Sequence, residues 1–264
     1  MYRKQRVMIE LSQITFRYPN HEAVFENFDW QVLAGDAWAV LGPSGCGKST
    51  LLYLLAGLRF PQFGSVTVSG EELTKPRPRT GLILQDFGLL PWATVMENVS
   101  LGLRLRQFYG PDGRHAPSDQ DIKDIEAQVT HWLKRLGLDA LRDKYPGQIS
   151  GGQRQRTAIA RTLATVPDLL LMDEPFASLD APTRKSLGRL VRRLRQEVGL
   201  TTVIVTHAIE EAARLGEKIL ILGMPPNRTT MVVDNQGAAK EGYSQTNAYL
   251  DLCTSLHKQL EIVQ

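Results

Sequence analysis

The sequence has few cysteines and lacks long apolar runs, and each shortage excludes a class of protein. Its 264 residues include only Cys46 and Cys253, which cannot form a disulfide framework and fit a reducing compartment. The longest apolar runs, such as the one at 51–56, hold about eight residues or fewer, whereas a membrane-spanning helix needs about 20. We therefore expect neither a disulfide-rich secreted fold nor an integral membrane protein.

The charge and the first residues narrow the class further. The basic start at 1–6 is followed by Glu10 and Gln13 before any apolar stretch, so no signal peptide is predicted. A formal net charge of only +3 argues against nucleic acid as the partner. The length allows a sizeable core in one or two domains. Composition thus indicates a cytoplasmic, globular protein and leaves its function open.

Short apolar runs recur along the chain and are typical of strands covered on both faces. They lie at 37–41, 81–84, 169–172, 202–205 and 218–222. A looser alternation at 7–16 predicts a further strand, which ends at the turn signal Tyr18-Pro-Asn20. Because helical stretches separate the apolar runs, we predict a doubly wound α/β fold with a mostly parallel sheet.

The middle of the chain differs, and residues 88–160 are predicted to form a mostly helical insertion. One helix face is marked by Ile122, Ile125, Val129, Leu133 and Leu136, with Gly137 at its end. A second helix is expected at 152–164, and the turn-rich segment 110–119 is expected to be a surface loop. After Pro225 the sequence predicts a few strand residues and a helix at 246–263.

A glycine-rich segment, Gly42-Pro-Ser-Gly-Cys-Gly47-Lys48-Ser49, follows the strand at 37–41 and opens a helix. Its glycines let consecutive backbone amides face a phosphate, and the helix N-terminus adds positive potential. Lys48 would reach the β- and γ-phosphates of a nucleotide, and the Ser49 hydroxyl would hold Mg²⁺. The alternative, an unrelated glycine-rich turn, fits this strand–loop–helix context poorly.

Two carboxylates end a buried strand at Leu169-Leu-Leu-Met-Asp173-Glu174. Ligands of open α/β sheets bind at the carboxyl ends of strands. Asp173 would therefore hold Mg²⁺, directly or through water, and Glu174 would act as the general base toward water. A solvated strand end is the alternative.

Ile149-Ser-Gly-Gly-Gln153-Arg-Gln-Arg156 is a second phosphate-seeking element. Ser150 can cap the following helix, while Gly151 and Gly152 expose amides at its N-terminus. Taken alone, the segment favours the alternative, a simple helix cap with a solvated basic face.

The order of these motifs resembles that of the ATP-binding subunits of ABC transporters over about residues 8–225. The shared elements are the phosphate loop, Gln85, Ser150-Gly-Gly-Gln153, the strand ending in Asp173-Glu174, Ser178-Leu-Asp180 and His207. The resemblance implies a phosphate-loop NTPase core with an antiparallel β subdomain and a helical subdomain. It implies one domain over 1–264, with a nucleotide-binding core at 1–87 and 161–225, a helical subdomain at 88–160 and a tail at 226–264.

The resemblance also implies roles for individual residues. Catalysis would use Glu174, His207, Gln85 and Lys48, with His207 on the γ-phosphate. Mg²⁺ would be held by Ser49, Gln85 and Asp173. ATP would be bound by Tyr18, Gly42, Pro43, Ser44, Gly45, Cys46, Gly47, Lys48, Ser49 and Thr50, and from a second subunit by Ser150, Gly151, Gly152, Gln153 and Asp180. Tyr18 would stack on adenine.

Three of these assignments have a structural alternative. Tyr18 lies in a turn after a strand, where it could be merely a half-buried tyrosine. Gln85 ends a strand and could be a plain surface residue, and His207 could be a structural histidine. Cys46 is given no catalytic role.

Three positions depart from the family pattern. Ile149 stands where leucine is usual, Ala208 follows His207 where aspartate is usual, and Pro182 replaces a leucine. None of them removes a nucleotide-contacting group, so ATPase competence is still expected.

The segment 85–99 looks like that of nitrate, sulfonate, taurine and pyrimidine-precursor importers, and Pro225-Pro-Asn-Arg228 is similar to theirs. In that family the segment faces a membrane subunit, here with Phe87, Leu89, Leu90 and Trp92 as apolar contacts. The alternative is that these residues pack within the helical region. The tail at 226–264 is too short for the regulatory β-barrel of sugar importers.

The resemblance therefore predicts an ATPase subunit of an importer for a small anionic solute, working at the cytoplasmic face of the plasma membrane. Its expected partners are a second ATP-binding subunit, membrane permease subunits and, indirectly, an external solute-binding protein. The alternatives are an ATPase for lipoprotein release or export, and a phosphate-loop nucleotide switch outside transport.

Overall fold

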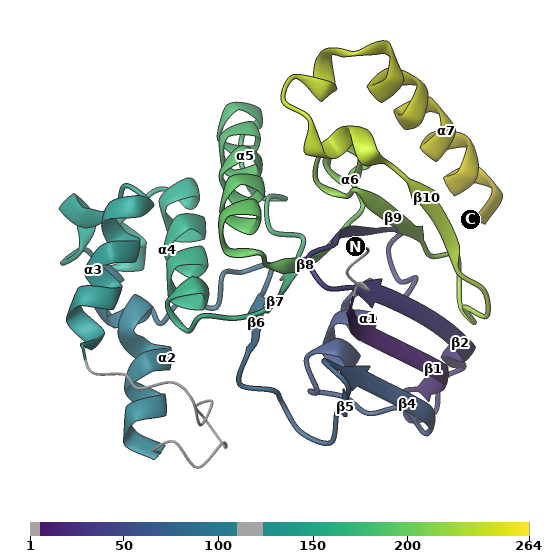
Figure 1. The fold of residues 1–264 in the computed structure, drawn as a ribbon, viewed down its shortest axis with the longest axis horizontal. Coiled ribbons are helices and arrows are strands. Elements are labelled where there is room, and N and C mark those ends of the chain that lie inside the picture. The colour runs from purple at the N-terminus through teal and green to yellow at the C-terminus, as the bar shows by residue number, and fades with distance from the viewer. Residues whose placement is uncertain (1–5, 110–123, 264) are drawn as a thin grey trace, which may run out of the picture. The chain divides into compact units, whose positions relative to one another are not determined.

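The computed structural model describes residues 6–109 and 124–263 (Figure 1). The chain divides into two compact units. Unit 1 consists of Met1–Arg77, Leu171–Glu174 and Val191–Gln264, and unit 2 of Pro78–Leu170 and Pro175–Leu190. The predicted boundaries of the helical subdomain at 88 and 160 stay a prediction. The expected loop at 110–119, and Ile122 with it, lie outside the described residues.

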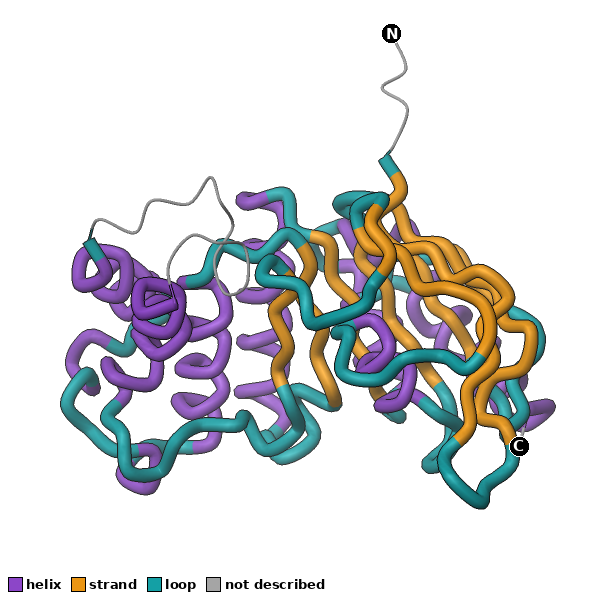
Figure 2. The backbone as a smooth tube through the Cα atoms, turned by 90° about the horizontal axis from the view of Figure 1, so that it is seen from below, coloured by secondary structure: helices purple, strands orange, loops and turns teal. Residues whose placement is uncertain are grey.

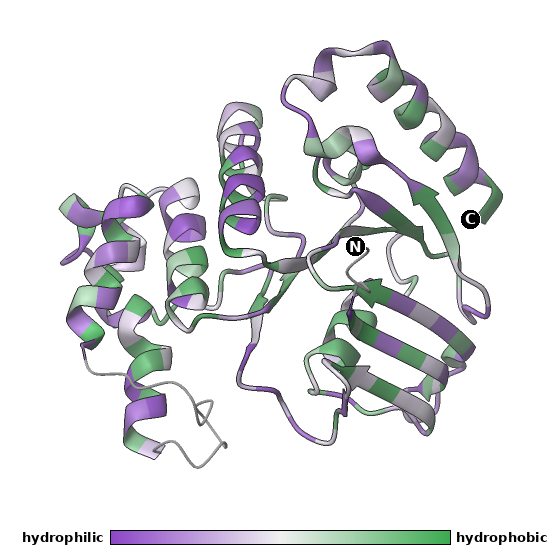
Figure 3. Ribbon diagram, in the orientation of Figure 1, coloured by the Kyte–Doolittle hydropathy of each residue, from purple (hydrophilic) through white to green (hydrophobic). Residues whose placement is uncertain are grey.

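Unit 1 contains an antiparallel sheet with the strand order β2-β1-β4-β5. Its strands are β1 (Val7–Arg17), β2 (Ala23–Leu33), β4 (Phe63–Val68) and β5 (Glu71–Glu72). Leu11 lies opposite both Trp30 and Val66, and all three side chains are buried. Hydrophobic and hydrophilic residues alternate along these strands (Figure 3), as expected for a sheet with one covered face.

Unit 1 also holds the sheet that carries the phosphate loop, with the order β10-β9-β3-β8 followed by the end of β7. The strands are β3 (Ala37–Leu41), β7 (Leu169–Asp173), β8 (Thr201–Thr206), β9 (Lys218–Ile221) and β10 (Met231–Asp234). β3 runs parallel to β8 and β9, and β10 is antiparallel to its neighbour β9. The predicted mostly parallel sheet is therefore confirmed, and every residue of β3 and β8 is buried, as expected for strands that are covered on both faces.

Where it is described, unit 1 contains the helices α1 (Lys48–Leu55), α6 (Ile209–Leu215) and α7 (Asn247–Val263), and also the end of a helix that it shares with unit 2. α7 confirms the helix predicted near the C-terminus. It buries Tyr249 and Leu256 in a core cluster with α6, β3 and β9, and Leu260 and Val263 pack against that cluster. The C-terminal helix is thus anchored to the sheet rather than lying free.

Unit 2 contains β6 (Thr80–Ile83), the beginning of β7 and the predicted helices. These are α2 (Val95–Tyr109), α3 (Ile125–Arg135), α4 (Gly151–Ala164) and the first part of α5 (Ala181–Val198), which continues into unit 1. α4 packs against α2 and α3. In Figure 2 the helices of this unit appear as purple coils. Residues 88–160 are thus mostly helical where described, as predicted.

Buried Asn98 on α2 fixes the loop that precedes this helix. Its Nδ2 donates to the carbonyl oxygens of Leu90, Ala93 and Thr94 at 2.9–3.1 Å, and its Oδ1 accepts from the Leu90 amide at 2.8 Å. A fully buried carboxamide with all these partners holds the 90–94 backbone in one conformation. Over the two described ranges, no helix has both the length and the apolar character that crossing a membrane requires.

Candidate functional site

The phosphate loop lies between β3 and α1, and neighbouring segments pack tightly against its buried side. A Cβ added to Gly42 would come within 2.6 Å of the Leu222 carbonyl oxygen, and one added to Gly47 within 2.5 Å of a Val24 methyl group. Gly45 and Gly47 also have positive φ angles of 81° and 105°, which glycine adopts without strain. Ser44 and Gly45 are exposed, so the outer side of the loop is open to a ligand.

Lys48 is almost completely buried, and its ammonium group is held by the loop's own backbone. Nζ donates to the carbonyl oxygens of Gly42 at 2.9 Å and Pro43 at 2.7 Å, and lies 3.9 Å from Cys46 Sγ. A cation in this position is ready to exchange carbonyl partners for phosphate oxygens. Burial raises the pKa of the Cys46 thiol, which keeps it protonated and inert.

Ser49 and Asp173 come together although 124 positions separate them in the sequence. The Ser49 hydroxyl donates to Asp173 Oδ1 at 3.3 Å, which joins the start of α1 to the end of β7. Burial raises the pKa of the Asp173 carboxyl, an effect opposed by the Ser49 hydrogen bond and the positive charge of Lys48. The predicted pair of oxygen donors is therefore formed.

Glu174 and His207 form a second pair at the same edge of the sheet. Glu174 Oε1 lies 2.9 Å from His207 Nδ1, and the exposed fractions of the two side chains are 18% and 60%. The Glu174 backbone has a positive φ of 42°, and its amide donates to the Val205 carbonyl oxygen at 3.0 Å. A left-handed conformation is unfavourable for glutamate, so β8 holds this carboxylate in a costly but defined position.

Tyr18 lies near the phosphate-loop helix. Its hydroxyl is 3.1 Å from the Thr50 Oγ1, and its ring packs edge-to-face against Phe16 with centroids 5.0 Å apart. The side chain is half-buried. Its predicted stacking on adenine stays a prediction, as does the alternative of a purely structural tyrosine.

The Ser150–Gln153 motif begins α4 in unit 2 with a reciprocal cap. The Gln153 amide donates to Ser150 Oγ at 3.3 Å, and the Ser150 amide donates to Gln153 Oε1 at 2.8 Å. Ser150 is therefore the helix cap that the sequence predicts. Gly152 is further required because an added Cβ would lie 2.6 Å from Thr183 Cγ2.

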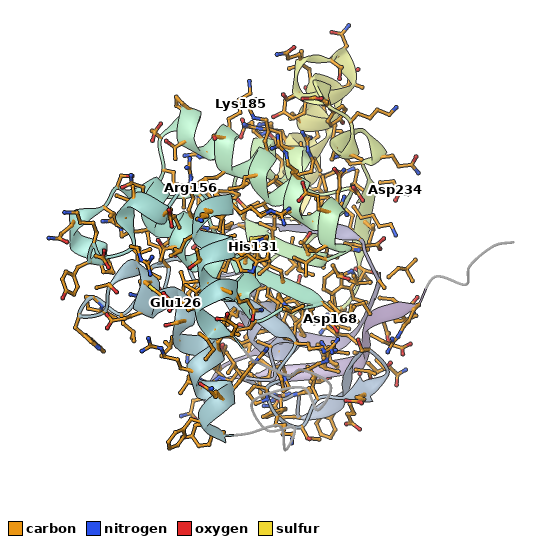
Figure 4. All side chains as sticks on the ribbon, turned by 60° about the vertical axis from the view of Figure 1, so that its left-hand side comes forward. Glu126, His131, Arg156, Asp168, Lys185 and Asp234 are labelled. Carbon is orange, nitrogen blue, oxygen red and sulfur yellow. The ribbon has the colours of Figure 1, made fainter. Side chains whose placement is uncertain are left out.

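The arginines of α4 are only in part the solvated basic face that the sequence allowed. Arg154 donates to the carbonyl oxygens of Pro146 and Ile149, and Arg161 to those of Phe87 and Gly88. Figure 4 marks Arg156, also on α4, and the exposed Lys185 on α5. Two of the three arginines of this helix thus serve to fix loops within unit 2.

Asp180 begins α5 and is exposed. Its Oδ2 accepts a 3.2 Å hydrogen bond from the Thr183 amide. Hydrogen bonds from the Thr183 side chain and from its backbone amide lower the pKa of the Asp180 carboxyl. The residue therefore caps a helix, and its predicted contact with a second subunit stays a prediction.

Gln85 lies exposed in the turn after β6, as the plain-surface alternative also allows. Of the four apolar residues expected to face a membrane subunit, Trp92 is 74% exposed, and Leu89 and Leu90 are half-buried. Phe87 is only 8% exposed, so its prediction as an available contact is wrong. Its positive φ of 68° belongs to the turn in which the ring is buried.

The oxygen donors of unit 1 fit a magnesium ion. Mg²⁺ is usually held by one or two protein oxygens together with waters and substrate phosphates. The Ser49 hydroxyl and the buried Asp173 carboxylate supply that donor set. Among the residues that the structure describes, no group of three His, Cys, Asp or Glu is arranged to hold a metal alone.

Comparison with known proteins identifies this arrangement. The family model described as "ABC transporter" matches residues 25–177, more than half of the chain. The chain belongs to the ABC transporter ATP-binding family. It is accordingly an ATP-binding protein and an ABC-type ATPase.

Curated relatives and solved structures agree with this assignment. The aliphatic sulfonates import ATP-binding protein SsuB of Bacillus cereus (strain ZK / E33L) is 38% identical over 86% of this chain and 84% of its own length. The sulfate/thiosulfate import ATP-binding protein CysA of Pseudomonas aeruginosa is 41% identical over 81% of this chain and 63% of its own. An ATP-binding cassette, solved as a dimer in a post-hydrolysis state with ADP and Pi, matches with a TM-score of 0.71 at 29% identity, covering 86% of this chain and 98% of that one.

Sequence reasoning missed one residue of this ATP-binding domain. The Asn227 side chain donates to the carbonyl oxygen of Cys46 inside the phosphate loop at 2.9 Å. Asn227 lies 181 positions after Cys46, within the segment Pro225-Pro-Asn-Arg228 noted above, but nothing in that segment indicates a contact with the phosphate loop, so only the folded structure reveals it.

Proposed function

We propose that this chain is the ATP-hydrolysing subunit of an importer for a small anionic solute. One observation carries the proposal: a buried ammonium, a hydroxyl–carboxylate pair and a glutamate–histidine pair all lie in the unit that holds the phosphate loop. That set provides a phosphate anchor, oxygen donors for a divalent cation and a base for water. The importer role is supported by relatives named for the import of sulfonates and of sulfate or thiosulfate.

In this proposal each residue has a distinct task. Lys48 binds the β- and γ-phosphates, and Tyr18 stacks on the adenine. Ser49 and Asp173 hold Mg²⁺, which supplies charge neutralisation on the phosphates, with Gln85 as a further contact. Glu174 accepts a proton from the attacking water, and His207 orients that carboxylate and donates to the γ-phosphate.

The remaining partners follow the same proposal. A second copy of the chain contributes Ser150, Gly151, Gly152, Gln153 and Asp180 to the nucleotide, and separate permease subunits carry the solute. The exposed Trp92 lies in the segment expected to contact a permease. The subunit would then work at the cytoplasmic face of the membrane, with a solute-binding protein outside.

The test is transport by the reconstituted complex. The chain is co-purified with its membrane subunits and placed in liposomes. Uptake of an alkanesulfonate, taurine, nitrate and sulfate is then compared in the presence of the solute-binding protein that is encoded beside this chain. ATP-dependent uptake of one of these anions is expected, with Lys48→Ala as the inactive control. ATP-dependent movement only in the outward direction would support an exporter instead. ATP binding without transport in either direction would support a nucleotide switch.

A further inference from the structure

Asn227 is a buried residue, 6% exposed, whose side chain connects three segments of unit 1. Its Nδ2 donates to the carbonyl oxygens of Cys46 at 2.9 Å and Val24 at 3.2 Å, and its Oδ1 accepts from the Gly223 amide at 3.0 Å. Two acceptors face the nitrogen and a donor faces the oxygen, so only this orientation of the amide satisfies all three partners.

The contact with Cys46 joins Asn227 to the buried side of the phosphate loop. Cys46 is fully buried, whereas Ser44 and Gly45 of the same loop are exposed, so Asn227 contacts a buried part of the loop. Val24, the second partner of Asn227, also packs against Gly47 of the loop. The Asn227 side chain therefore supports the loop from behind, where it can fix the loop's conformation without touching a nucleotide.

The third contact leads to the C-terminal helix. The Met224 amide donates to the Val263 carbonyl oxygen in the last turn of α7 at 3.2 Å. A Cβ added to Gly223 would lie 3.2 Å from both the Cβ and the carbonyl oxygen of Val263, so the two backbones are in close contact. α7 is itself anchored to the core through Tyr249 and Leu256. A continuous path thus runs from α7 through residues 223 and 224 to Asn227 and then to the phosphate loop.

We propose that Asn227 is a positioning residue through which the last turn of α7 sets the nucleotide affinity of the phosphate loop. The inference rests on the proposed ATP binding at Lys48. The loop presents its amides to phosphate only in one conformation, and a bond to the Cys46 carbonyl holds that conformation before the nucleotide arrives. Without the bond, binding has to order the loop, and affinity falls.

Asn235 provides a matched control for a purely structural effect. It is also a buried asparagine of unit 1, 4% exposed, and its Nδ2 donates to the carbonyl oxygens of Ala213 at 2.8 Å and Gly216 at 2.7 Å. None of its hydrogen-bond partners belongs to the phosphate loop. Asn235→Ala should therefore lower the melting temperature about as much as Asn227→Ala while leaving the loop intact.

The first experiment measures ATP affinity and melting temperature of the purified chain with both variants. We expect Asn227→Ala to weaken ATP binding by at least about fivefold, as the loss of one preorganising hydrogen bond implies, and Asn235→Ala to change it less than twofold. Asn227→Asp keeps the acceptor for Gly223 but loses the donor to Cys46, so it should weaken binding similarly if the alanine variant folds poorly. Equal affinity in wild type, Asn227→Ala and Asn227→Asp would overturn the inference.

The second experiment tests the connection to α7 by hydrogen exchange. In wild type, saturating ATP should slow exchange at the Met224 amide, which is bonded to Val263, because coupling between two sites is reciprocal. In Asn227→Ala this protection should be lost while exchange of the α1 amides still slows. Identical protection of Met224 in both proteins would contradict the inference. Failure of the wild type to bind ATP would instead contradict the proposed function.

Discussion

His207 Nδ1 lies 2.9 Å from Glu174 Oε1, so a histidine from the end of β8 orients a carboxylate from the end of β7. The adjacent Asp173 is directed to Ser49 instead, at 3.3 Å. Two neighbouring carboxylates therefore have different partners and different burial, since Asp173 is 7% exposed and the Glu174 side chain 18%. These different surroundings suit the Asp173 carboxylate to binding a metal ion and the Glu174 carboxylate to accepting a proton.

Glu174→Gln should abolish turnover while ATP binding persists. Loss of a positioned general base costs about 10²- to 10⁴-fold in rate, whereas the amide keeps the size of the side chain. Phosphate release and ATP affinity are measured together, and size-exclusion chromatography with ATP should show a stabilised dimer. Hydrolysis at the wild-type rate would exclude Glu174 as the base.

Tyr18 is tested by two substitutions that separate its hydroxyl from its ring. Tyr18→Phe removes only the contact with Thr50 and should leave ATP affinity nearly unchanged, whereas Tyr18→Ala removes the ring. If the ring stacks on adenine, the alanine variant should lose about 1–3 kcal/mol of binding free energy. Titration with ATP and with inorganic triphosphate distinguishes the cases, because triphosphate affinity should not respond. An equal loss for both ligands would favour a structural tyrosine.

Gly152→Ala should destabilise unit 2, because the new Cβ would meet Thr183 Cγ2 at 2.6 Å. Overpacking of this kind costs about 1–3 kcal/mol of unfolding free energy. Adding Thr183→Ser removes that methyl group and should recover most of the loss in a denaturant titration. If stability recovers but ATPase activity does not, Gly152 also acts at the nucleotide. No recovery at all would show that the cost lies elsewhere.

The raised pKa of Asp173 gives the protein without nucleotide a specific pH dependence. Because burial raises the pKa in the folded state above its ordinary value of 3.8, the folded protein binds more protons than the unfolded chain above that pH. The contribution of Asp173 to stability should therefore decrease as the pH rises from 3.8 through the raised pKa. Asp173→Asn should remove this contribution and be the more stable protein at neutral pH. The unfolding free energies of wild type and Asp173→Asn are measured by chemical denaturation across the acidic pH range. The same pH dependence in both proteins would contradict the predicted decrease.

The elements around the phosphate loop could be predicted closely because their signals are local. β3 was expected at 37–41 and lies at Ala37–Leu41, and α4 starts one residue before its predicted beginning. β2 and β4 were not predicted. β2 does carry an alternating signal, since Phe28, Trp30 and Val32 are buried between exposed polar residues. Its pairing with β1, which contains several register shifts, depends on tertiary structure. The contact of Asn227 with Cys46 depends entirely on tertiary structure.

The site residues also divide into those that local motifs reveal and those whose surroundings depend on the folded structure. Lys48, Ser49 and Asp173 were recognised from motifs, and the structure joins Ser49 to Asp173 as expected. Their catalytic roles stay predictions, as do the contacts from a second subunit. Phe87 was misassigned because hydrophobicity alone cannot tell a buried turn residue from an exposed anchor.

The ammonium of Lys48 has a consequence for which anions the loop accepts. Two backbone carbonyls already hold it, so an incoming anion has to exchange with them rather than occupy a vacant charge. A single inorganic phosphate offers few other contacts with which to offset that exchange. In the proposed binding mode a nucleoside triphosphate would also reach Ser49 and the loop amides, and so we expect the loop to select its ligand by the number of simultaneous contacts rather than by negative charge alone.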